Sequence, residues 1–249
     1  MPDSRVNTLY LIPTPISRRK ENLVLPQHTI DVIRSVNTFV VEKMQTARSF
    51  LQWIDHPTPD YKQTFRVLNK KTPDHEVVSF LQFLKEGDVG LMSEAGAPGV
   101  ADPGAKLVSL AHQNNFNVQP LVGPSSILLA LMGSGLNGQS FTFHGYLPIR
   151  ENERNRAIQD LERESSRSSQ TQIFMETPHR NKVLFDQLLQ TCQPSTKLCI
   201  ACNLTADDQF LKTRRIMEWK NSALPDLEKK PCLFLLLSHK FCSHVYVVA

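Results

Sequence analysis

The sequence predicts an α/β protein with two stacked domains. Along the 249 residues, short apolar segments rich in β-branched residues alternate with amphipathic segments whose apolar residues recur at helical spacing. This alternation runs through twice, with a break at Val122–Gly123. Because alternating strands and helices favour a mainly parallel sheet, we expect an N-terminal α/β domain over residues 1–122 and a C-terminal α/β domain over residues 123–249.

The first half of the chain shows apolar runs of strand length separated by helical patterns. One helix should begin at Pro73, because proline suits a first helical turn, and should end at Gly87. Strands are expected at Val6–Ile12, Thr38–Glu42, Gly90–Met92 and Phe116–Val122, and further helices at Thr29–Val36, Arg48–Ile54 and Ala105–Asn114.

The second half repeats the pattern. Asn152–Glu164 is heavily charged with a narrow apolar side, so we expect an exposed helix there, followed by a surface loop at Arg163–Gln170. Strands are expected at Phe141–His144, Gln172–Met175, Lys197–Asn203 and Pro231–Ser238, and helices at Ser125–Met132 and Asn181–Leu189.

Composition limits the class of protein. The net charge of +4 permits an anionic partner such as RNA but does not demand one. Five scattered cysteines suit a reducing compartment better than a disulfide framework. Because the apolar runs are too short for a signal segment or a bilayer span, we expect a cytoplasmic protein that does not enter a membrane.

The strongest local signal is the loop Ser93–Gly104, which follows one predicted strand and precedes a predicted helix. Ligands of open α/β sheets bind at the carboxyl ends of strands. The three glycines, two prolines and two acids of this loop favour a binding loop over a plain turn. The segment Gly123-Pro124-Ser125-Ser126 opens a helix in a similar position, where its hydroxyls suit a helix cap and a ligand contact equally.

Other patterns carry less weight. Gly133–Gly138 spells G-x-G-x-x-G, but it follows a helix and precedes a strand, the reverse of the dinucleotide fingerprint. Cys199 and Cys202 lie three apart in a predicted strand and should point to opposite faces, so we expect no metal site. The cluster Glu176–Arg180 gains interest only from its place at a strand's carboxyl end.

Five segments resemble one family. Leu9–Ile16, Ser93–Gly104, Gly123–Ser125, Phe141–Pro148 and Phe174–Arg180 resemble, in the same order, motifs of the bacterial 2'-O-methyltransferases that modify a cytidine in small-subunit ribosomal RNA. That family is part of the tetrapyrrole-methylase superfamily. The likeness runs from about residue 9 to about residue 238.

The resemblance implies a homodimer in which two α/β domains enclose S-adenosylmethionine in the cleft between them. It implies a methyltransferase acting on ribosomal RNA. The cofactor-binding residues that it implies are Pro13, Ser93, Glu94, Ala95, Gly96, Ser125, Ser126, Met175, Ala201, Asn203, Pro231 and Cys232.

The sequence departs from that family on the acceptor side. The family's E-D-T-R-x-T stretch is Glu42–Thr46 here, with only the Glu and the last Thr kept, and Lys230-Pro231 is closer to the tetrapyrrole methylases. A tetrapyrrole or other small molecule as acceptor, or cofactor binding without methyl transfer, therefore stay as alternatives. We expect a basic rim from Arg18, Arg19, Lys20 and Lys43, and Glu42, Glu94, Glu176 and His179 are unranked candidates for a base.

Overall fold

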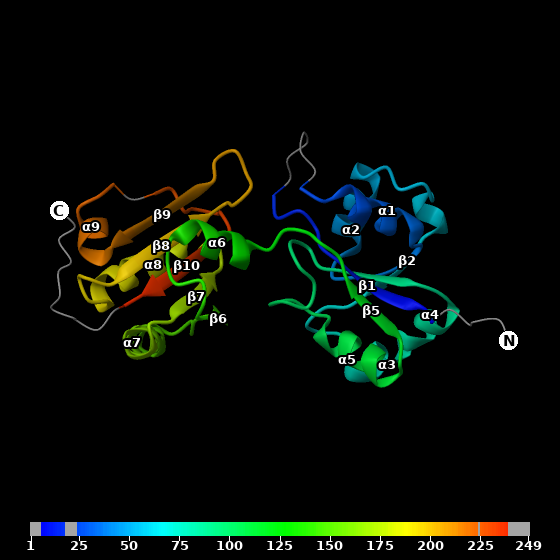
Figure 1. Cartoon of the computed structure of the whole chain (residues 1–249), viewed down its shortest axis with the longest axis horizontal. Helices are drawn as coiled ribbons and strands as arrows, with labels where there is room; N and C mark the ends of the chain where they lie inside the picture. The colour runs from blue at the N-terminus through cyan, green and yellow to red at the C-terminus, as the bar shows by residue number, and fades with distance from the viewer. Residues whose placement is uncertain (1–5, 18–23, 224, 239–249) are drawn as a thin grey trace. The chain divides into compact units, whose positions relative to one another are not determined.

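The computed structural model describes residues 6–17, 24–223 and 225–238. The chain is an α/β protein with two five-stranded sheets, one in each of two compact units (Figure 1). The division falls between Ser125 and Ser126. We call the part before it unit 1 and the part after it unit 2.

In unit 1, every pair of neighbouring strands is parallel, in the order β3-β2-β4-β1-β5. The central strand β1 lies between β4 and β5, to which its neighbours in sequence must cross over. The elements are β1 (Thr8–Ile12), α1 (Gln27–Ser35), β2 (Thr38–Val41), α2 (Met44–Trp53), η1 (Asp60–Lys62), β3 (Thr64–Val67), α3 (Asp74–Ser79), α4 (Leu81–Glu86), β4 (Val89–Met92), α5 (Ala105–Gln113) and β5 (Asn117–Pro120).

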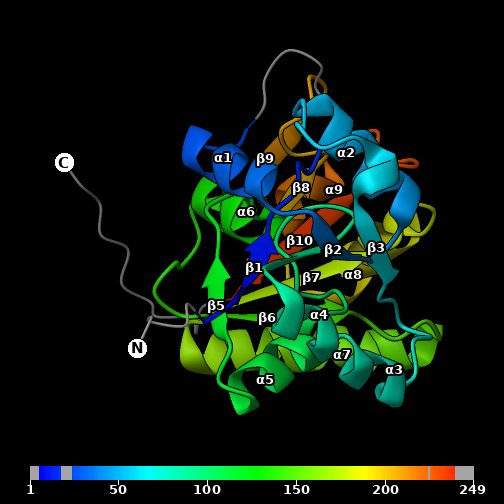
Figure 2. The same ribbon diagram turned by 90° about the vertical axis from the view of Figure 1, so that its right-hand side faces the viewer.

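Unit 1 has three layers. In Figure 2, α1 and α2 lie above the sheet and α3, α4 and α5 below it. The strands are apolar on both faces: Tyr10 and Ile12 pack with α1 and α2, whereas Leu9 packs with the other three helices. Burial on both faces explains why these strands are continuous apolar runs, which made them easy to predict.

Unit 2 holds a mixed sheet in the order β6-β7-β10-β8-β9. Only β6 and β7 are parallel neighbours; the other three pairs are antiparallel. The mainly parallel sheet that the sequence predicts is therefore correct for unit 1 and wrong for unit 2. The elements are α6 (Ser126–Ser134), β6 (Phe141–Tyr146), α7 (Glu151–Ser168), β7 (Thr171–Glu176), α8 (Asn181–Thr191), β8 (Lys197–Cys202), β9 (Phe210–Arg215), α9 (Ile216–Lys220) and β10 (Cys232–Leu237).

The two faces of this second sheet are covered differently. Helices α7, α8 and α9 pack on one face, where Phe174, Phe234 and Trp219 are buried in one apolar cluster. On the other face α6 places Ala130 and Leu131 over β7, β8 and β10. Every residue of β10 is buried, as expected for a central strand.

Helix α7 is longer and more buried than the sequence predicts. It continues to Ser168 through the segment expected to be a loop. Ser165 is fully buried, its hydroxyl donates to the carbonyl of Gln170 at 2.8 Å, and it accepts from the amide of Ser238 at 2.9 Å. The charged residues of this turn pair with one another on the outer side, as Arg167 does with Glu164 at 2.7 Å. Polarity alone therefore hid a buried side of the helix.

Other differences concern short elements. Strands β3 and β9 and helices η1 and α9 are not predicted, α2 begins earlier than expected, and the helix expected from Pro73 to Gly87 is divided into α3 and α4. Within the described ranges, no helix is both long enough and apolar enough to cross a membrane.

Candidate functional site

The carboxyl ends of the unit 1 strands lie at one edge of the sheet, because all five strands are parallel. Pro13 follows β1, Glu42 follows β2, and Ser93 follows β4. The register pairs Val41 and Ile12 with the same residue of β4, Met92. Three segments predicted separately from the sequence are thus brought together at the edge where ligands of such sheets bind.

The loops after β1 and β4 are joined by backbone hydrogen bonds. The amide of Thr14 donates to the carbonyl of Gly96 at 2.9 Å, and the amide of Gly96 donates to the carbonyl of Thr14 at 3.0 Å. The hydroxyl of Thr14 also donates to the carbonyl of Ser93 at 3.4 Å. Gly96 has a φ of 78°, a conformation that favours glycine. The two loops therefore form one rigid strip.

The turn after β5 packs against the same strip. A Cβ added to Gly123 would lie 2.3 Å from Cγ and 2.5 Å from Cβ of Pro13, so only glycine permits this approach. The hydroxyl of Thr29 holds the turn by donating to the carbonyl of Val122 at 2.8 Å. Ser125 and Ser126 follow, half-buried, where α6 begins.

The altered segment after β2 contacts the loop after β4. Glu94 accepts a hydrogen bond from the hydroxyl of Thr46 at 3.1 Å and forms an ion pair with Lys43 at 3.7 Å. The side chains of Lys43 and Glu94 are about half exposed. The positive charge of Lys43 is therefore partly offset, which weakens its expected part in a basic rim. Arg18, Arg19 and Lys20 lie outside the described residues.

Asp102 is the most perturbed carboxyl group of unit 1. Its pKa is raised to about 6, first because burial penalises the carboxylate and second because Glu42 repels it. Lys70, which follows β3, and the hydroxyl of Ser93 act in the opposite direction. A carboxyl with a pKa near neutrality is suited to exchanging protons with a ligand.

In unit 2, the predicted residues also gather at one edge of the sheet. Strands β7 and β8 end where β10 begins, because both are antiparallel to β10. Leu233 of β10 is in register with both Met175 and Ala201. The amide of Asn203 donates to the carbonyl of Pro231 at 2.9 Å. Residues predicted from three distant segments are thus neighbours here.

A lysine holds two loops of this edge together. The ammonium of Lys230 lies 3.1 Å from a carboxylate oxygen of Asp208 and 2.9 Å from one of Asp226. These carboxylates raise the pKa of Lys230, which therefore stays charged. Asn203, with a φ of 52°, donates from its side-chain amide to Asp208. The side chain of Asn181 fixes the next stretch by donating to the carbonyl of Lys230 at 2.7 Å.

The cluster after β7 contains a buried ion pair. The side chain of Glu176 is fully buried, and its Oε1 accepts from Arg180 Nη2 at 2.6 Å and from Nε at 3.0 Å. Glu176 Oε2 is buried without a hydrogen-bond partner among the described residues. His179 is exposed. The engagement with Arg180 makes Glu176 a structural anchor rather than a free base.

The side chains of two predicted contacts point into the protein. Ala201 is 1% exposed and Cys232 is 5% exposed. A ligand at this edge would therefore meet their backbone groups. That any of the twelve residues contacts a cofactor stays a prediction.

Two weaker sequence patterns lie where they were expected. Cys199 and Cys202 of β8 are buried in different apolar clusters, on opposite faces of the sheet. Gly133 lies within α6, and β6 begins at Phe141, so the glycine pattern has the helix-then-strand order predicted for it. No group of three or more His, Cys, Asp or Glu side chains suited to a metal ion occurs in the part of the chain that the structure describes.

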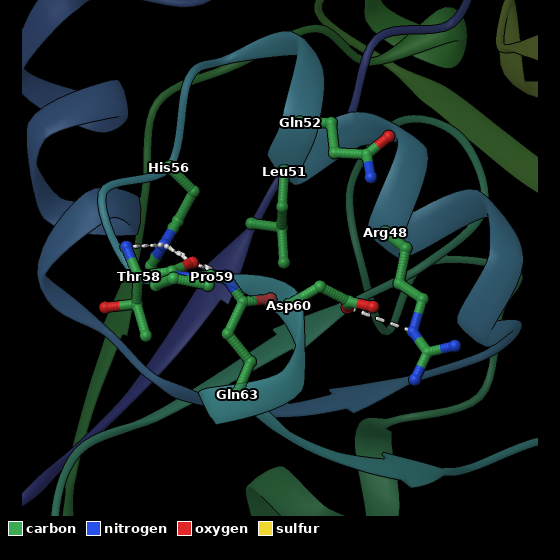
Figure 3. Close-up of a pocket in the computed structure, with 8 residues that line it drawn as sticks. All are labelled: Arg48, Leu51, Gln52, His56, Thr58, Pro59, Asp60 and Gln63. Carbon is green, nitrogen blue, oxygen red and sulfur yellow. Dashed lines mark hydrogen bonds and ion pairs between the residues drawn. The ribbon is translucent and has the colours of Figure 1, made fainter.

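A cavity of about 100 Å³ lies beside α2 and η1 (Figure 3). His56 fills one side of it and is committed to the backbone: its Nε2 faces the carbonyl oxygen of Val36 at 2.9 Å, and its Nδ1 accepts from the amide of Thr58 at 3.2 Å. Ligand pockets for molecules of cofactor size are several times larger, roughly 300 to 1,000 Å³. This cavity is therefore a packing feature.

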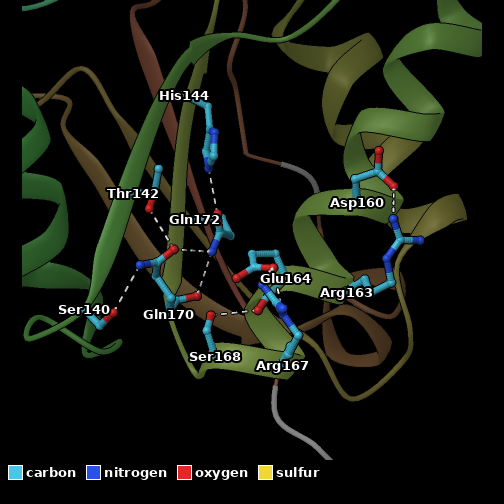
Figure 4. Close-up of polar contacts among 10 residues, drawn as sticks. All are labelled: Ser140, Thr142, His144, Asp160, Arg163, Glu164, Arg167, Ser168, Gln170 and Gln172. Atoms are coloured by element: carbon cyan, nitrogen blue, oxygen red, sulfur yellow. Dashed lines mark hydrogen bonds and ion pairs between the residues drawn. The ribbon is translucent and has the colours of Figure 1, made fainter.

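A wider hollow of about 510 Å³ lies in unit 2 between α7 and the strands β6 and β7 (Figure 4). Its polar groups satisfy one another: His144 contacts the amide oxygen of Gln172 at 2.6 Å, and Arg163 pairs with Asp160 at 2.5 Å. Because its charges are neutralised locally, the hollow offers no group that selects an ion.

Sequence reasoning missed Asp102 and Lys70 as site residues. Asp102 was seen only as one acid of the post-β4 loop, and its burial beside Glu42 depends on strand order. Lys70 follows β3, a strand that was not predicted. The apolar alternation of Thr64–Val67 after a proline-rich turn was the signal available.

The fold and these edges agree with comparisons to known proteins. A family model described as Tetrapyrrole (Corrin/Porphyrin) Methylases matches residues 8–218. The chain belongs to this family and is, by that membership, a methyltransferase.

Relatives with one shared name are more specific. The protein from Vibrio cholerae named Ribosomal RNA small subunit methyltransferase I is 29% identical over 94% of this chain and 77% of its own length. The protein of that name from Micromonospora olivasterospora is 32% identical over 83% of this chain and 63% of its own length, and the one from Bacillus subtilis is 30% identical over 72% and 58%. The chain thus spans about three fifths to three quarters of these relatives.

Solved structures support the fold alone. The methyltransferase CobJ superposes with a TM-score of 0.59 at 15% identity, covering 93% of each chain. A cobalt precorrin-4 methyltransferase superposes with a TM-score of 0.57 at 12% identity, covering 92% of this chain and 94% of the other.

Proposed function

We propose that this chain transfers a methyl group from S-adenosylmethionine to a ribose 2'-hydroxyl of ribosomal RNA. The observation that carries the proposal is the set of relatives named Ribosomal RNA small subunit methyltransferase I, at 29 to 32% identity. An RNA acceptor would place the protein in the cytoplasm, as the sequence predicts. The resemblance also implies a homodimer.

The residues at both edges fit the cofactor. In unit 1, the positive φ of Gly96 and the close approach of Gly123 to Pro13 leave backbone rather than side chains beside the joined loops. In unit 2, the unpartnered oxygen of Glu176 is an acceptor for a ligand donor. When bound, S-adenosylmethionine supplies a methyl group activated by its sulfonium. The chain's own task is then to orient the acceptor.

The acceptor hydroxyl must also lose a proton. We propose Asp102 as the proton acceptor, because its pKa of about 6 keeps it mostly ionised at neutral pH while leaving it more basic than an ordinary carboxylate. Ser93 and Glu42 shape that basicity from the ends of the neighbouring strands β4 and β2.

The decisive experiment is transfer of tritium from methyl-labelled cofactor into small-subunit ribosomal RNA or into a small-molecule extract. Label in the ribose of RNA supports the proposal. Label in a small molecule supports the alternative that the structural likeness to CobJ and the Lys230-Pro231 pair favour. Cofactor binding without transfer would indicate a binder, the alternative suggested by Met44 and Gln45.

Cofactor binding is tested separately by thermal unfolding. Ligand at about 100 times its Kd should add about 2.7 kcal/mol of stability. A melting temperature unchanged by millimolar cofactor would contradict the binding site. NAD should give no shift, because Gly133–Gly138 lies at a helix end.

RNA binding has its own test. Replacing Arg18, Arg19 and Lys20 together by Ala should weaken RNA binding and lower its salt dependence by at most about three phosphate contacts. Cofactor affinity should not change. RNA binding equal to that of the parent would show that these residues do not contact the acceptor.

A further inference from the structure

Two cysteines face each other across neighbouring strands of unit 2. Cys202, the last residue of β8, is in register with Cys232, the first residue of β10. The next pair along, Asn203 and Pro231, is joined by the hydrogen bond from the Asn203 amide. Hydrogen-bonded and non-hydrogen-bonded pairs alternate in an antiparallel ladder, so the cysteines form a non-hydrogen-bonded pair.

That position has the spacing a disulfide needs. Cα atoms of a non-hydrogen-bonded pair are about 4.5 Å apart, which is at the short end of the range of about 4.4 to 6.8 Å that disulfides span. Cys202 and Cys232 are also buried in the same apolar cluster, so both side chains lie on one face of the sheet. Cys199, one turn of the pleat away, lies on the other face.

The two thiols differ in acidity from their neighbours. Hydrogen bonding from Cys232 lowers the pKa of Cys202, and the charge of Lys230 acts in the same direction. Burial instead raises the pKa of Cys199 to about 11 and also raises that of Cys192. Since the thiolate is the reactive form, Cys202 is the most readily oxidised of the four described cysteines.

We propose that Cys202 and Cys232 form a reversible disulfide when the protein meets a small hydroperoxide. The Cys202 sulfur attacks one peroxide oxygen, breaks the O–O bond and becomes a sulfenic acid, and hydroxide leaves as water after taking the thiol proton. The Cys232 sulfur then attacks the Cys202 sulfur and displaces the second oxygen as water. Two thiols are oxidised to one S–S bond while one peroxide is reduced to two waters.

Burial selects the oxidant. Cys202 is fully buried and Cys232 is 5% exposed, which excludes bulky reagents but leaves the end of β10 open to a molecule as small as hydrogen peroxide. A disulfide at the short end of the allowed spacing is strained and easily reduced again. It would tie together the strand ends beside Asn203 and Pro231, and its effect on the cofactor rests on the proposed function.

The test uses the whole chain, freed of reductant and treated with hydrogen peroxide. Tryptic digestion without reduction should yield Leu198–Lys212 linked to the peptide that contains Cys232, with Cys202 identified by fragmentation. Dithiothreitol should separate the two peptides. Absence of this linked pair at peroxide concentrations that oxidise added glutathione would overturn the proposal.

Two variants are matched controls. Cys199→Ser, in the same strand but on the other face, should still form the link, whereas Cys232→Ser should not. If Cys232→Ser does not fold, fragmentation of the parent's linked peptide still decides between Cys199 and Cys202. A link through Cys199 would contradict the proposal.

Cofactor affinity is then compared between the reduced and oxidised chains. A change in Kd of several-fold, reversed by dithiothreitol, would support control of the site by the disulfide. An unchanged Kd in a fully linked sample would overturn that control while leaving the disulfide itself. Failure of both forms to bind S-adenosylmethionine would contradict the proposed function instead.

Discussion

The two units build their strand-end regions in different ways. Unit 1 uses close backbone contacts, with Gly96 bonded to Thr14 and Gly123 packed on Pro13. Unit 2 uses ionised and amide side chains, namely the pair of Glu176 with Arg180 and the links around Lys230. A parallel sheet delivers all its loops to one edge, where they join through backbone, whereas a mixed sheet needs side chains to fix segments that arrive and leave in opposite directions.

The largest effect is expected where unit 2 depends on charge. Glu176→Gln removes the negative partner of Arg180 and should lower the free energy of unfolding by about 3 kcal/mol, since breaking a buried ion pair leaves one charge uncompensated. Denaturant unfolding measures it. The control Glu164→Gln breaks an exposed pair with Arg167 and should change stability by less than about 0.5 kcal/mol. Equal effects of the two variants would contradict this account of unit 2.

The next effect separates unit 1 by steric fit. Gly123→Ala places a Cβ against the rigid ring of Pro13 and should cost about 2 kcal/mol, measured in the same way. Gly87→Ala is the matched control, because its extended backbone, with a φ of 174°, and open surroundings accept a methyl group. If Gly123→Ala unfolds like the parent, the packing of the two loops is not tight.

The smallest effect concerns the one strongly perturbed acid of unit 1. The folded pKa of Asp102, about 6, exceeds its ordinary value of 3.8, so ionisation costs stability as pH rises through that interval. Asp102→Asn should therefore be more stable than the parent by about 1 kcal/mol at about pH 8, after allowance for partial exposure, and equal to it at about pH 3.

Unfolding of Asp102→Asn and the parent at both pH values checks the sign, and a methyl-transfer assay checks the role. Loss of transfer with gained stability is expected of a proton acceptor. A variant that is less stable at the higher pH would show that the carboxylate is stabilised in the fold.

The sequence analysis found the elements whose residues are buried on both faces. Strands β1, β4 and β10 are continuous apolar runs and could hardly be missed. Strands β3 and β9 lie at the edges of their sheets, where half of the side chains meet water and the apolar signal falls. Direction was a further limit, since nothing local in β10 shows that it runs antiparallel to β7.

The candidate site was predictable to the same extent. Loops such as Ser93–Gly104 show their position by following a strand, and the parallel sheet of unit 1 then brings them together. The properties of Asp102 depend instead on burial and on Glu42, far away in sequence. Such long-range electrostatics follow only from the strand order.

The order β3-β2-β4-β1-β5 also bears on how the chain is made. Strand β1 pairs only with β4 and β5, so it stays without a partner until about eighty more residues have been synthesised, residues 13–88. Unit 2 contains the hairpin of β8 and β9, whose pairing is local and fast to form. The half that leaves the ribosome first is therefore expected to fold more slowly than the half that follows, and its apolar first strand is the segment most in need of protection by a chaperone during translation.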